Sequence, residues 1–338
     1  MTSLDQYLNN ISEGAVLTEQ EMESVMRQIM KGDAQDEQIA ALLTRLAERG
    51  EAVSEITGAA RVMREMAAGI NAPSDAMDCC GTGGDGSGTY NISTAVALVS
   101  AACGVPVAKH GNRAASSKSG AADVLEALGA NLNLSKEQLE IALKQFNFCF
   151  LMAPHHHQAM KHVMPVRKSL GFRTIFNLLG PLANPAGTKF QLIGVFDKKW
   201  VRPMAEVLNN LGTKGAWVVH GQDGLDEITT TTATDIAILK NGEIEEKTIT
   251  PDDYGLEVAM PDDLKGGDAK ENAAALRALL EGKKSPYRDI VLANVSAVLN
   301  IHGKVDSLRD GVAIAAANID NGKAMKALEN YIEFSKEK

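Results

Sequence analysis

Glycine is concentrated in one segment that runs from a short apolar stretch into an expected helix. Residues 81–94 read Gly-Thr-Gly-Gly-Asp-Gly-Ser-Gly-Thr-Tyr-Asn-Ile-Ser-Thr. Glycine lets a ligand approach main-chain N–H groups closely, and a helix N-terminus attracts anions. The pattern matches neither the dinucleotide-binding G-x-G-x-x-G nor the P-loop G-x-x-x-x-G-K-[ST]. It therefore predicts a different kind of anion-binding loop, the alternative being a flexible surface turn that ends in a helix cap.

A second segment, residues 109–120, is rich in positive charge and hydroxyl groups. It reads Lys-His-Gly-Asn-Arg-Ala-Ala-Ser-Ser-Lys-Ser-Gly, and no acidic residue follows until Asp123. The whole chain has a formal net charge of -9, so this local excess of cations indicates an anionic ligand. Lysine, arginine and serine match phosphate oxygens directly. A solvated loop between a strand and a helix is the alternative.

A third segment places two carboxylates side by side after a strand and a glycine-containing turn. Asp226 and Glu227 follow His-Gly-Gln-Asp-Gly-Leu at 220–225. One or two carboxylates suit Mg²⁺, which completes its coordination with water and phosphate oxygens. Adjacent acids are also common in solvated turns. Beside two expected anion sites, the pair favours magnesium.

Composition excludes several classes of protein. The 338 residues predict about two domains, and 45% hydrophobic with 23% charged residues argues against disorder. The negative net charge disfavours nonspecific binding to nucleic acid or to an anionic membrane. No apolar run approaches the ~18 residues of a membrane span, and the first residues lack the pattern of a signal peptide. Four cysteines without zinc-site spacing fit a reducing compartment, so we expect a cytoplasmic protein.

The first seventy residues show only helical patterns. Thr18 and Glu21 form a capping-box pair before an apolar stripe of helical spacing, and a further helix is expected from about Ser54 to Gly69. From residue 71 onward, short strands alternate with helices, which predicts an α/β domain with a central, mostly parallel sheet flanked by helices. We therefore expect a small helical domain (1–70), joined by a returning helical segment at about 160–182, and a larger α/β domain (71–338).

The α/β part has identifiable elements. Strands are expected at 77–80, 105–108, 148–152, 192–196 and 216–220, with helices at about 92–102, 120–128 and 200–211. Residues 235–250 predict a hairpin with a type I′ turn at Asn241 and Gly242. The chain from about residue 268 is expected to be mostly helical.

The three segments together resemble the anthranilate phosphoribosyltransferase family. The matching motifs are Cys-Gly-Thr-Gly-Gly-Asp at 80–85, Asn-Ile-Ser-Thr at 91–94, Lys-His-Gly-Asn-Arg at 109–113, Ala-Met-Lys-His-Val at 159–163, Pro-Val-Arg at 165–167, Arg-Thr-Ile-Phe-Asn-Leu-Leu-Gly-Pro at 173–181 and Asp-Glu at 226–227. They span essentially the whole chain in order. The resemblance implies two domains joined by a hinge, a homodimer, and small-molecule substrates.

The resemblance also implies a reaction and a set of roles. The family joins anthranilate to 5-phosphoribosyl 1-diphosphate, giving N-(5-phosphoribosyl)anthranilate and pyrophosphate in tryptophan biosynthesis. By the matching motifs, the phosphoribosyl-diphosphate site would comprise Gly81, Gly84, Asp85, Thr89, Asn91, Ile92, Ser93, Thr94, Lys109, His110, Gly111, Asn112, Arg113, Ala114, Ala115, Ser116, Ser117 and Ala121. Anthranilate would contact Gly81, Asn112 and Arg167. Mg²⁺ would contact Ser93, Asp226 and Glu227.

No covalent catalytic residue is expected, because departure of pyrophosphate from C1 of the ribose requires charge stabilisation and orientation. Two other functions stay open. A pyrimidine-nucleoside phosphorylase shares the two-domain plan but has no need of the Asp226–Glu227 pair. A noncatalytic regulatory protein that binds nucleic acid is opposed by the acidic charge.

Two runs of reactive side chains are expected to be structural. Consecutive residues cannot all point at one ion, so His155, His156 and His157 predict a solvated helix start, with a metal site as the alternative. Cys79 and Cys80 are expected to alternate inward and outward on a strand, and redox chemistry is the alternative.

Overall fold

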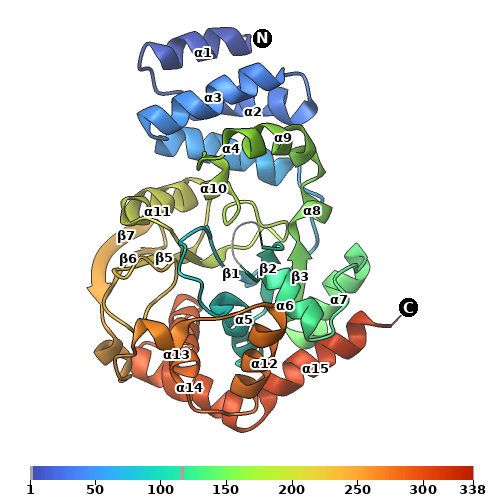
Figure 1. The fold of residues 1–338 in the computed structure, drawn as a ribbon, viewed down its shortest axis with the longest axis vertical. Coiled ribbons are helices and arrows are strands. Elements are labelled where there is room, and N and C mark those ends of the chain that lie inside the picture. The colour runs from blue at the N-terminus through green and yellow to red at the C-terminus, as the bar shows by residue number, and fades with distance from the viewer. Residues whose placement is uncertain (1–2, 115–117, 338) are drawn as a thin grey trace.

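The computed structural model describes residues 3–114 and 118–337, and it opens with a layer of helices (Figure 1). These are α1 (Leu4–Ser12), α2 (Glu19–Lys31), α3 (Asp36–Arg49) and α4 (Val53–Glu65). The Thr18 N–H donates to Glu21 Oε2 at 2.8 Å, and Thr18 Oγ1 accepts from the Glu21 N–H at 3.3 Å. This reciprocal pair is the capping box that the sequence predicts, and it satisfies N–H groups that the first helical turn leaves free.

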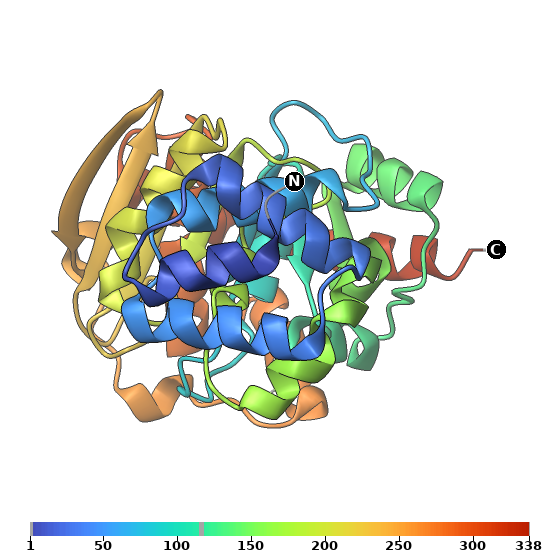
Figure 2. The same ribbon diagram turned by 90° about the horizontal axis from the view of Figure 1, so that it is seen from above.

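A seven-stranded sheet lies below the helical layer. Its strands are β1 (Met77–Gly81), β2 (Val107–Gly111), β3 (Phe148–Met152), β4 (Phe190–Gly194), β5 (Gly215–Gly221), β6 (Thr234–Lys240) and β7 (Glu243–Ile249). The spatial order is β3-β2-β1-β4-β5-β6-β7. The first five strands run parallel, and β6 and β7 add an antiparallel hairpin at one edge (Figure 2). The predicted α/β fold with a mostly parallel sheet is therefore confirmed.

Alternation along the strands divides the core into two parts. On β5, Trp217 and Val219 join one apolar cluster, whereas Ala216 and Val218 join the other. This follows from the two-residue period of a strand, which sends successive side chains to opposite faces. The hairpin turn has Asn241 at φ 52° and Gly242 at φ 90°, as a type I′ turn requires.

Helices cover both faces of the sheet. One cluster contains buried residues from α5 (Ile92–Ala102), α6 (Ala121–Ala127), α7 (Lys136–Phe146), α12 (Ala269–Leu280), α13 (Pro286–Ile301), α14 (Leu308–Asp320) and α15 (Lys323–Ser335). The other contains α11 (Val201–Asn210) together with α1–α4. The helical layer therefore shares its apolar core with one face of the sheet.

The segment between β3 and β4 returns to the helical layer. It contains α8 (Ala153–His156), a 3-10 turn (Gln158–His162), α9 (Met164–Leu170) and α10 (Phe176–Leu179). The 3-10 turn contacts α2, and α9 contacts α3 (Figure 1). A division of the chain into domains after residue 70 stays a prediction, because buried side chains run without a break from α4 into α11.

Some boundaries differ from those expected. Strand β2 begins at Val107 and not at Val105, because Pro106 has no N–H to donate and offers only its carbonyl, to the Met77 N–H. Helix α4 ends at Glu65, four residues before Gly69, and the Ala68 N–H donates to the carbonyl of His156. A tertiary contact thus replaces the last turn of that helix.

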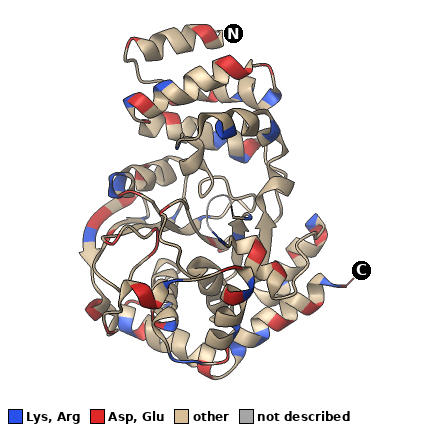
Figure 3. Cartoon of the chain, viewed as in Figure 1, with Lys and Arg blue, Asp and Glu red and all other residues tan. Residues whose placement is uncertain are grey.

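The lengths of the helices and the distribution of charge bear on two classes of partner, membranes and nucleic acids. Within residues 3–114 and 118–337, no helix is both long and apolar enough to cross a bilayer. Lys and Arg are interspersed with Asp and Glu along the helices (Figure 3).

The packing of α2 on α4 generates a stability prediction. A Cβ added to Gly58 would lie 2.4 Å from the carbonyl oxygen of Glu19 and 3.1 Å from Cβ of Met22. Gly58→Ala should therefore lower the free energy of unfolding by about 1–3 kcal/mol, although alanine is the better helix former. Gly180→Ala is the matched control, because nothing lies within 4 Å of its added Cβ. Urea unfolding of both variants measures the difference; a Gly58 variant as stable as the control would contradict this account.

Candidate active site

The site lies where the order of the sheet reverses. The chain passes from β1 outward to β2 and β3 and then returns to the other side of β1 as β4. In open α/β sheets, ligands bind beyond the carboxyl ends of the strands at such a point. Gly81 and Gly194 are register partners at these ends. The Thr82 N–H donates to the Gly194 carbonyl at 2.9 Å, so the glycine loop leaves the sheet directly at the switch point.

Both glycines are required because Asp226 passes against them. A Cβ on Gly194 would lie 1.5 Å from the carbonyl oxygen of Asp226, and one on Gly81 would lie 2.1 Å from its Oδ2. The Gly83 N–H donates to Asp226 Oδ2 at 2.7 Å. The structure thus brings the acidic pair after β5 into contact with the glycine loop.

The carboxylates at this point crowd one another. Burial raises the pKa of Asp226, and the neighbouring carboxyl of Asp85 raises it further. Burial and the charge of Asp226 raise the pKa of Glu227. The Glu227 carboxylate accepts a hydrogen bond from the Ser93 N–H at the start of α5, which opposes that rise. A cation beside Asp226 and Glu227 would favour the charged form of both carboxyls.

The ammonium group of Lys109 provides a positive charge close to the acidic pair. The residue is buried, and its Nζ donates to the carbonyl of Cys79 at 2.7 Å and to Ser93 Oγ at 3.1 Å. Its charge lowers the pKa of Glu227 and of the buried Asp78, opposing the larger effect of burial on each. Lys109 therefore links β1, β2 and the start of α5.

The donor set fits magnesium. Ser93 donates its N–H to Glu227, whose carboxyl lies near that of Asp226, so one hydroxyl and two carboxylates lie close together beside the glycine loop. Among the described residues, no three or more His, Cys, Asp and Glu side chains form a metal centre by themselves. Two carboxylates with the remaining positions left for water and phosphate is the usual arrangement for Mg²⁺.

The glycine loop leads into the first turn of α5, whose N-cap side chain does not cap the helix. Asn91 stands at the N-cap position but makes no side-chain cap hydrogen bond. Ile92 and Thr94 are buried, and Thr94 Oγ1 has no partner among the described residues. Gly84 has φ 76°, and Thr89 pairs with Lys265 in an isolated antiparallel bridge. The Thr82–Gly194 hydrogen bond and the Thr89–Lys265 bridge therefore fix the two ends of the glycine loop.

Part of the basic segment, residues 109–120, makes its contacts with α6 and not with the acidic pair. Gly111 ends β2, Asn112 Oδ1 accepts from the Arg113 N–H at 2.8 Å, and the exposed Arg113 guanidinium pairs with Asp123 and Glu126. The Ala114 N–H donates to Asp123 Oδ2 at 2.9 Å, and Ala121 begins α6. The predicted residues Ala115, Ser116 and Ser117 lie outside the described residues.

Arg167 lies apart from the glycine loop, on α9. It lines a hollow of about 640 Å³ with Lys161, Met164, Pro165, Lys168, Phe172 and Asn177. Its guanidinium lies 5.4 Å from the ring centroid of Phe176, and burial lowers its pKa. It pairs with no carboxylate in the described part of the chain. Among the described residues its side chain donates a hydrogen bond to Met164 Sδ, and none is found to Gly81 or Asn112.

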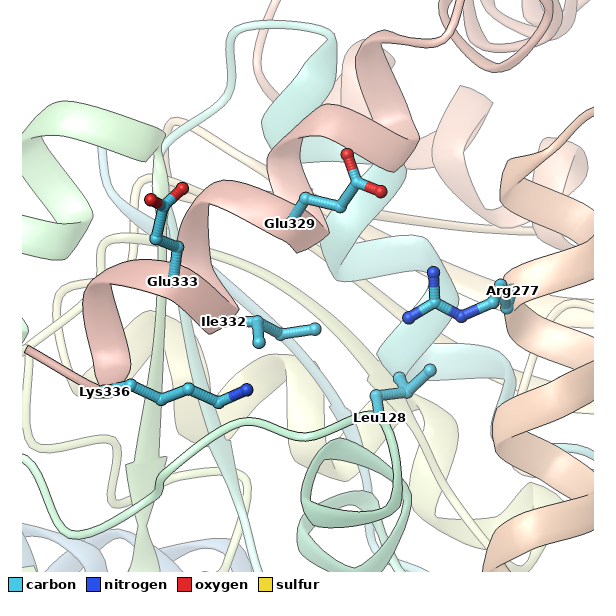
Figure 4. Close-up of a pocket in the computed structure, with 6 residues that line it drawn as sticks. All are labelled: Leu128, Arg277, Glu329, Ile332, Glu333 and Lys336. Atoms are coloured by element: carbon cyan, nitrogen blue, oxygen red, sulfur yellow. The ribbon is translucent and has the colours of Figure 1, made fainter.

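A second hollow lies far from this region. It has a volume of about 450 Å³ and is formed by α6, α12 and α15, with Leu128 and Ile332 between charged side chains (Figure 4). It contains none of the predicted site residues and lies away from α9 (Figure 1).

The structure adds residues that the sequence did not single out. Arg173 donates to the carbonyl of Gly84 and lies 4.3 Å from the ring centroid of Phe196, so the returning segment contacts the glycine loop. Asp78 Oδ1 accepts from the His110 N–H at 3.2 Å. The Arg-Thr-Ile-Phe run pointed to Arg173, whereas nothing in the local pattern singled out Asp78.

The triple histidine differs from the prediction of a solvated helix start. His155 is exposed, but His156 and His157 are buried. His157 packs edge-on against His110, with ring centroids 5.2 Å apart. The segment packs against β2 and the Ala68 carbonyl, and this tertiary contact buries two of the three rings. Cys79 is buried and Cys80 half-buried, and all four cysteines are free thiols.

Comparison with known proteins defines the class. The glycosyl transferase family's helical bundle domain matches residues 5–67, and that family's a/b domain matches residues 73–325. The fold is therefore that of a glycosyl transferase of this two-part kind.

Curated relatives define the family more closely. The anthranilate phosphoribosyltransferase of Rhodospirillum rubrum is 56% identical over 322 residues, covering 95% of this chain and 93% of that protein. That of Paramagnetospirillum magneticum is 54% identical over 329 residues, covering 97% and 95%. The chain belongs to the anthranilate phosphoribosyltransferase family, as its motifs predict.

Solved structures agree. The anthranilate phosphoribosyltransferase of Thermus thermophilus superposes with a TM-score of 0.93 at 44% identity, covering 98% of this chain and 99% of that one. The Saccharomyces cerevisiae enzyme in complex with PRPP and Mg gives 0.90 at 26% identity, covering 98% and 97%. Another yeast structure contains 4-fluoroanthranilate.

The buried histidines generate a pH prediction. Burial, with His157 nearby, lowers the pKa of His110 to about 3, and burial lowers that of His157 to about 4. An unfolded histidine has a pKa near 6.5, so below about that pH the unfolded chain binds protons that the folded chain does not. The stability associated with these neutral rings is present above pH ~6.5 and declines as the pH falls toward 4.

Chemical unfolding across pH 4–8 measures this effect. In His110→Gln, the number of protons taken up on unfolding near pH 5 should fall by about one. His155→Gln is the control, because its ring is exposed. Equal pH slopes for wild type and His110→Gln would exclude a neutral, buried His110.

Proposed function

We propose that this chain transfers the phosphoribosyl group of 5-phosphoribosyl 1-diphosphate to the amine of anthranilate, giving N-(5-phosphoribosyl)anthranilate and pyrophosphate in tryptophan biosynthesis. The observation that carries the proposal is the contact of Asp226 with the glycine loop at the switch point of the sheet. It brings anion-binding main chain and metal-binding carboxylates to one place. The names of the relatives support the same reaction.

The diphosphate substrate would lie along the glycine loop and the start of α5. The proposed contacts are those that the motifs imply, namely Gly81, Gly84, Asp85, Thr89, Asn91, Ile92, Ser93, Thr94 and the segment 109–117 with Ala121. Main-chain N–H groups and the helix dipole would stabilise the phosphates. The buried charge of Lys109 adds positive potential beneath them.

Ser93, Asp226 and Glu227 would hold Mg²⁺. When bound, the ion supplies charge neutralisation for the diphosphate as it leaves C1 of the ribose. The raised pKa values of the neighbouring Asp226 and Glu227 carboxyls support this assignment, since a cation beside them would favour their charged forms. The yeast relative solved with PRPP and Mg is consistent with it.

Arg167 would pair with the carboxylate of anthranilate. Its half-buried guanidinium has no carboxylate partner among the described residues, and the hollow beside it includes apolar surface from Met164 and Phe172. We also propose that residues 1–70, with the returning segment, and residues 71–338 close about a hinge when both substrates bind.

Catalysis would rest on orientation and electrostatics. The aromatic amine is neutral near pH 7, so the chain has to aim it at C1 and needs no strong base. Closure around the substrates would exclude water, which otherwise competes for C1. A pyrimidine-nucleoside phosphorylase is less well supported, because that reaction has no need of the acidic pair at the loop.

The assembly and the location of the protein are also proposals. We expect a homodimer, as the resemblance implies. A cytoplasmic location is supported by the four free thiols, which fit a reducing compartment.

The acidic pair generates the first functional prediction. Asp226→Asn combined with Glu227→Gln should reduce turnover at least 10²-fold, because several kcal/mol of transition-state stabilisation depend on the bound cation. Loss of anthranilate fluorescence with phosphoribosyl diphosphate and Mg²⁺ measures the rate. Glu245→Gln with Glu246→Gln is the matched control on the edge strand β7. Full wild-type turnover in excess chelator would remove the metal from the mechanism and favour the phosphorylase.

Arg167 generates the second functional prediction. Arg167→Ala should raise the anthranilate KM by the equivalent of about 2–4 kcal/mol, because a desolvated carboxylate loses a bidentate partner, and should change the KM for phosphoribosyl diphosphate little. Aniline lacks the carboxylate, so its disadvantage relative to anthranilate should largely disappear in this variant. Arg202→Ala is the control, since that exposed guanidinium pairs with Glu206 and Glu246. Equal weakening of both substrates would place Arg167 on the phosphates instead.

A further inference from the structure

Asn91 stands at the N-cap of α5 but directs its side chain away from its own helix. An asparagine at this position normally accepts a hydrogen bond from the N–H groups of the first turn. Here Asn91 Oδ1 accepts from Asn272 Nδ2 at 2.8 Å and from Ser119 Oγ at 3.3 Å. Its Nδ2 donates to the carbonyl of Ser119 at 3.2 Å. An amide oxygen has two lone pairs, and these two bonds occupy both.

Asn272 is the residue that holds this arrangement from outside the loop. It lies in the first turn of α12 and is 2% exposed. Its Nδ2 reaches Asn91, and its Oδ1 accepts from the Gly267 N–H at 2.8 Å. Asn272 lies 181 residues from Asn91 in the chain, and its side chain joins the end of the glycine loop to the segment 264–267.

The segment 264–267 is itself fastened along the glycine loop. The Gly266 N–H donates to the Gly88 carbonyl at 2.9 Å, and the Tyr90 N–H donates to the Leu264 carbonyl at 3.0 Å. A Cβ on Gly266 would lie 2.7 Å from both the Thr89 carbonyl oxygen and Asn272 Oδ1. There is no room for a side chain at this position. The glycine loop, the segment 264–267, which we call the strap, and Asn272 therefore form one tightly packed unit.

We infer that Asn272 is a positioning residue for the phosphoribosyl-diphosphate site, acting through Asn91. This rests on the proposed function. By occupying both lone pairs of Asn91 Oδ1 together with Ser119, Asn272 prevents Asn91 from capping its own helix. The N–H groups at the N-terminus of α5 therefore stay available to bind the ligand and Glu227. Without Asn272, Asn91 is released to accept from its own first turn, and the loop loses its link to the strap.

Two substitutions of Asn272 separate its bonds. Asn272→Asp keeps the acceptor for Gly267 and removes the donor to Asn91, and a carboxylate in the first turn of α12 suits the helix dipole. Asn272→Ala removes both bonds. We expect KM for phosphoribosyl diphosphate to rise at least tenfold in both variants, because both lose the donor to Asn91, and the carboxylate of Asn272→Asp faces Asn91 Oδ1 as a second acceptor. The KM for anthranilate should stay within twofold of wild type in both.

Binding of inorganic pyrophosphate with Mg²⁺, measured by calorimetry, tests the same point without turnover. Its affinity should fall in both variants. Gly266→Ala, which forces the strap away from Thr89 by main-chain contact, should also raise the KM for phosphoribosyl diphosphate. Asn300→Ala is the control, because within the described residues the Asn300 side chain donates to the carbonyls of Val305 and Asp306, at the far end of α13. Circular dichroism verifies the fold of each variant.

The outcomes are distinct. Wild type that forms no product from anthranilate and phosphoribosyl diphosphate overturns the proposed function, and pyrophosphate affinities then decide the role of Asn272 alone. An active wild type whose Asn272 variants keep their KM for phosphoribosyl diphosphate and their pyrophosphate affinity overturns only the positioning role. Equal increases in both KM values would mean that Asn272 stabilises the fold in general and does not position Asn91.

Discussion

A buried ammonium group, that of Lys109, is the interaction on which the centre of the molecule depends. A charge of this kind is costly to bury unless opposite charge and hydrogen-bond acceptors surround it. The carbonyl of Cys79 and the hydroxyl of Ser93 accept from it, and the carboxyls of Asp78 and Glu227 lie within its field. Lys109 on β2 thereby holds β1 and the start of α5 together. Its positive charge also partly balances the acidic pair in the absence of a ligand.

The switch point of the sheet imposes a second requirement, which is space. The chain that carries Asp226 passes so close to β1 and β4 that Gly81 and Gly194 admit no side chain. The same absence of side chains exposes the main chain of the loop to a ligand. Close packing of the acidic segment and access for an anion therefore have one common cause.

Support for the loop comes from parts of the chain that are remote in sequence. Asn272 on α12 holds Asn91 and Gly267, while Tyr287 on α13 donates to the carbonyl of Asn91 at 3.2 Å and stacks on Tyr90 with ring centroids 4.4 Å apart. From the other side, Arg173 donates to the carbonyl of Gly84. The glycine loop is thus held between the C-terminal helices and the segment that returns to the helical layer. Movement of that segment would therefore shift the loop.

The sequence by itself determined the features that rest on local rules. The Thr18 capping box, the hairpin turn at Asn241 and Gly242, the buried strand 148–152 and the glycine loop before α5 follow from capping, backbone freedom and periodicity. Only the tertiary structure decided that His156 and His157 are buried, that Asp226 meets Gly83, and that Asn272 withholds Asn91 from its own helix. These contacts join residues far apart in the chain, and no periodicity or motif spacing encodes the direction in which such side chains meet.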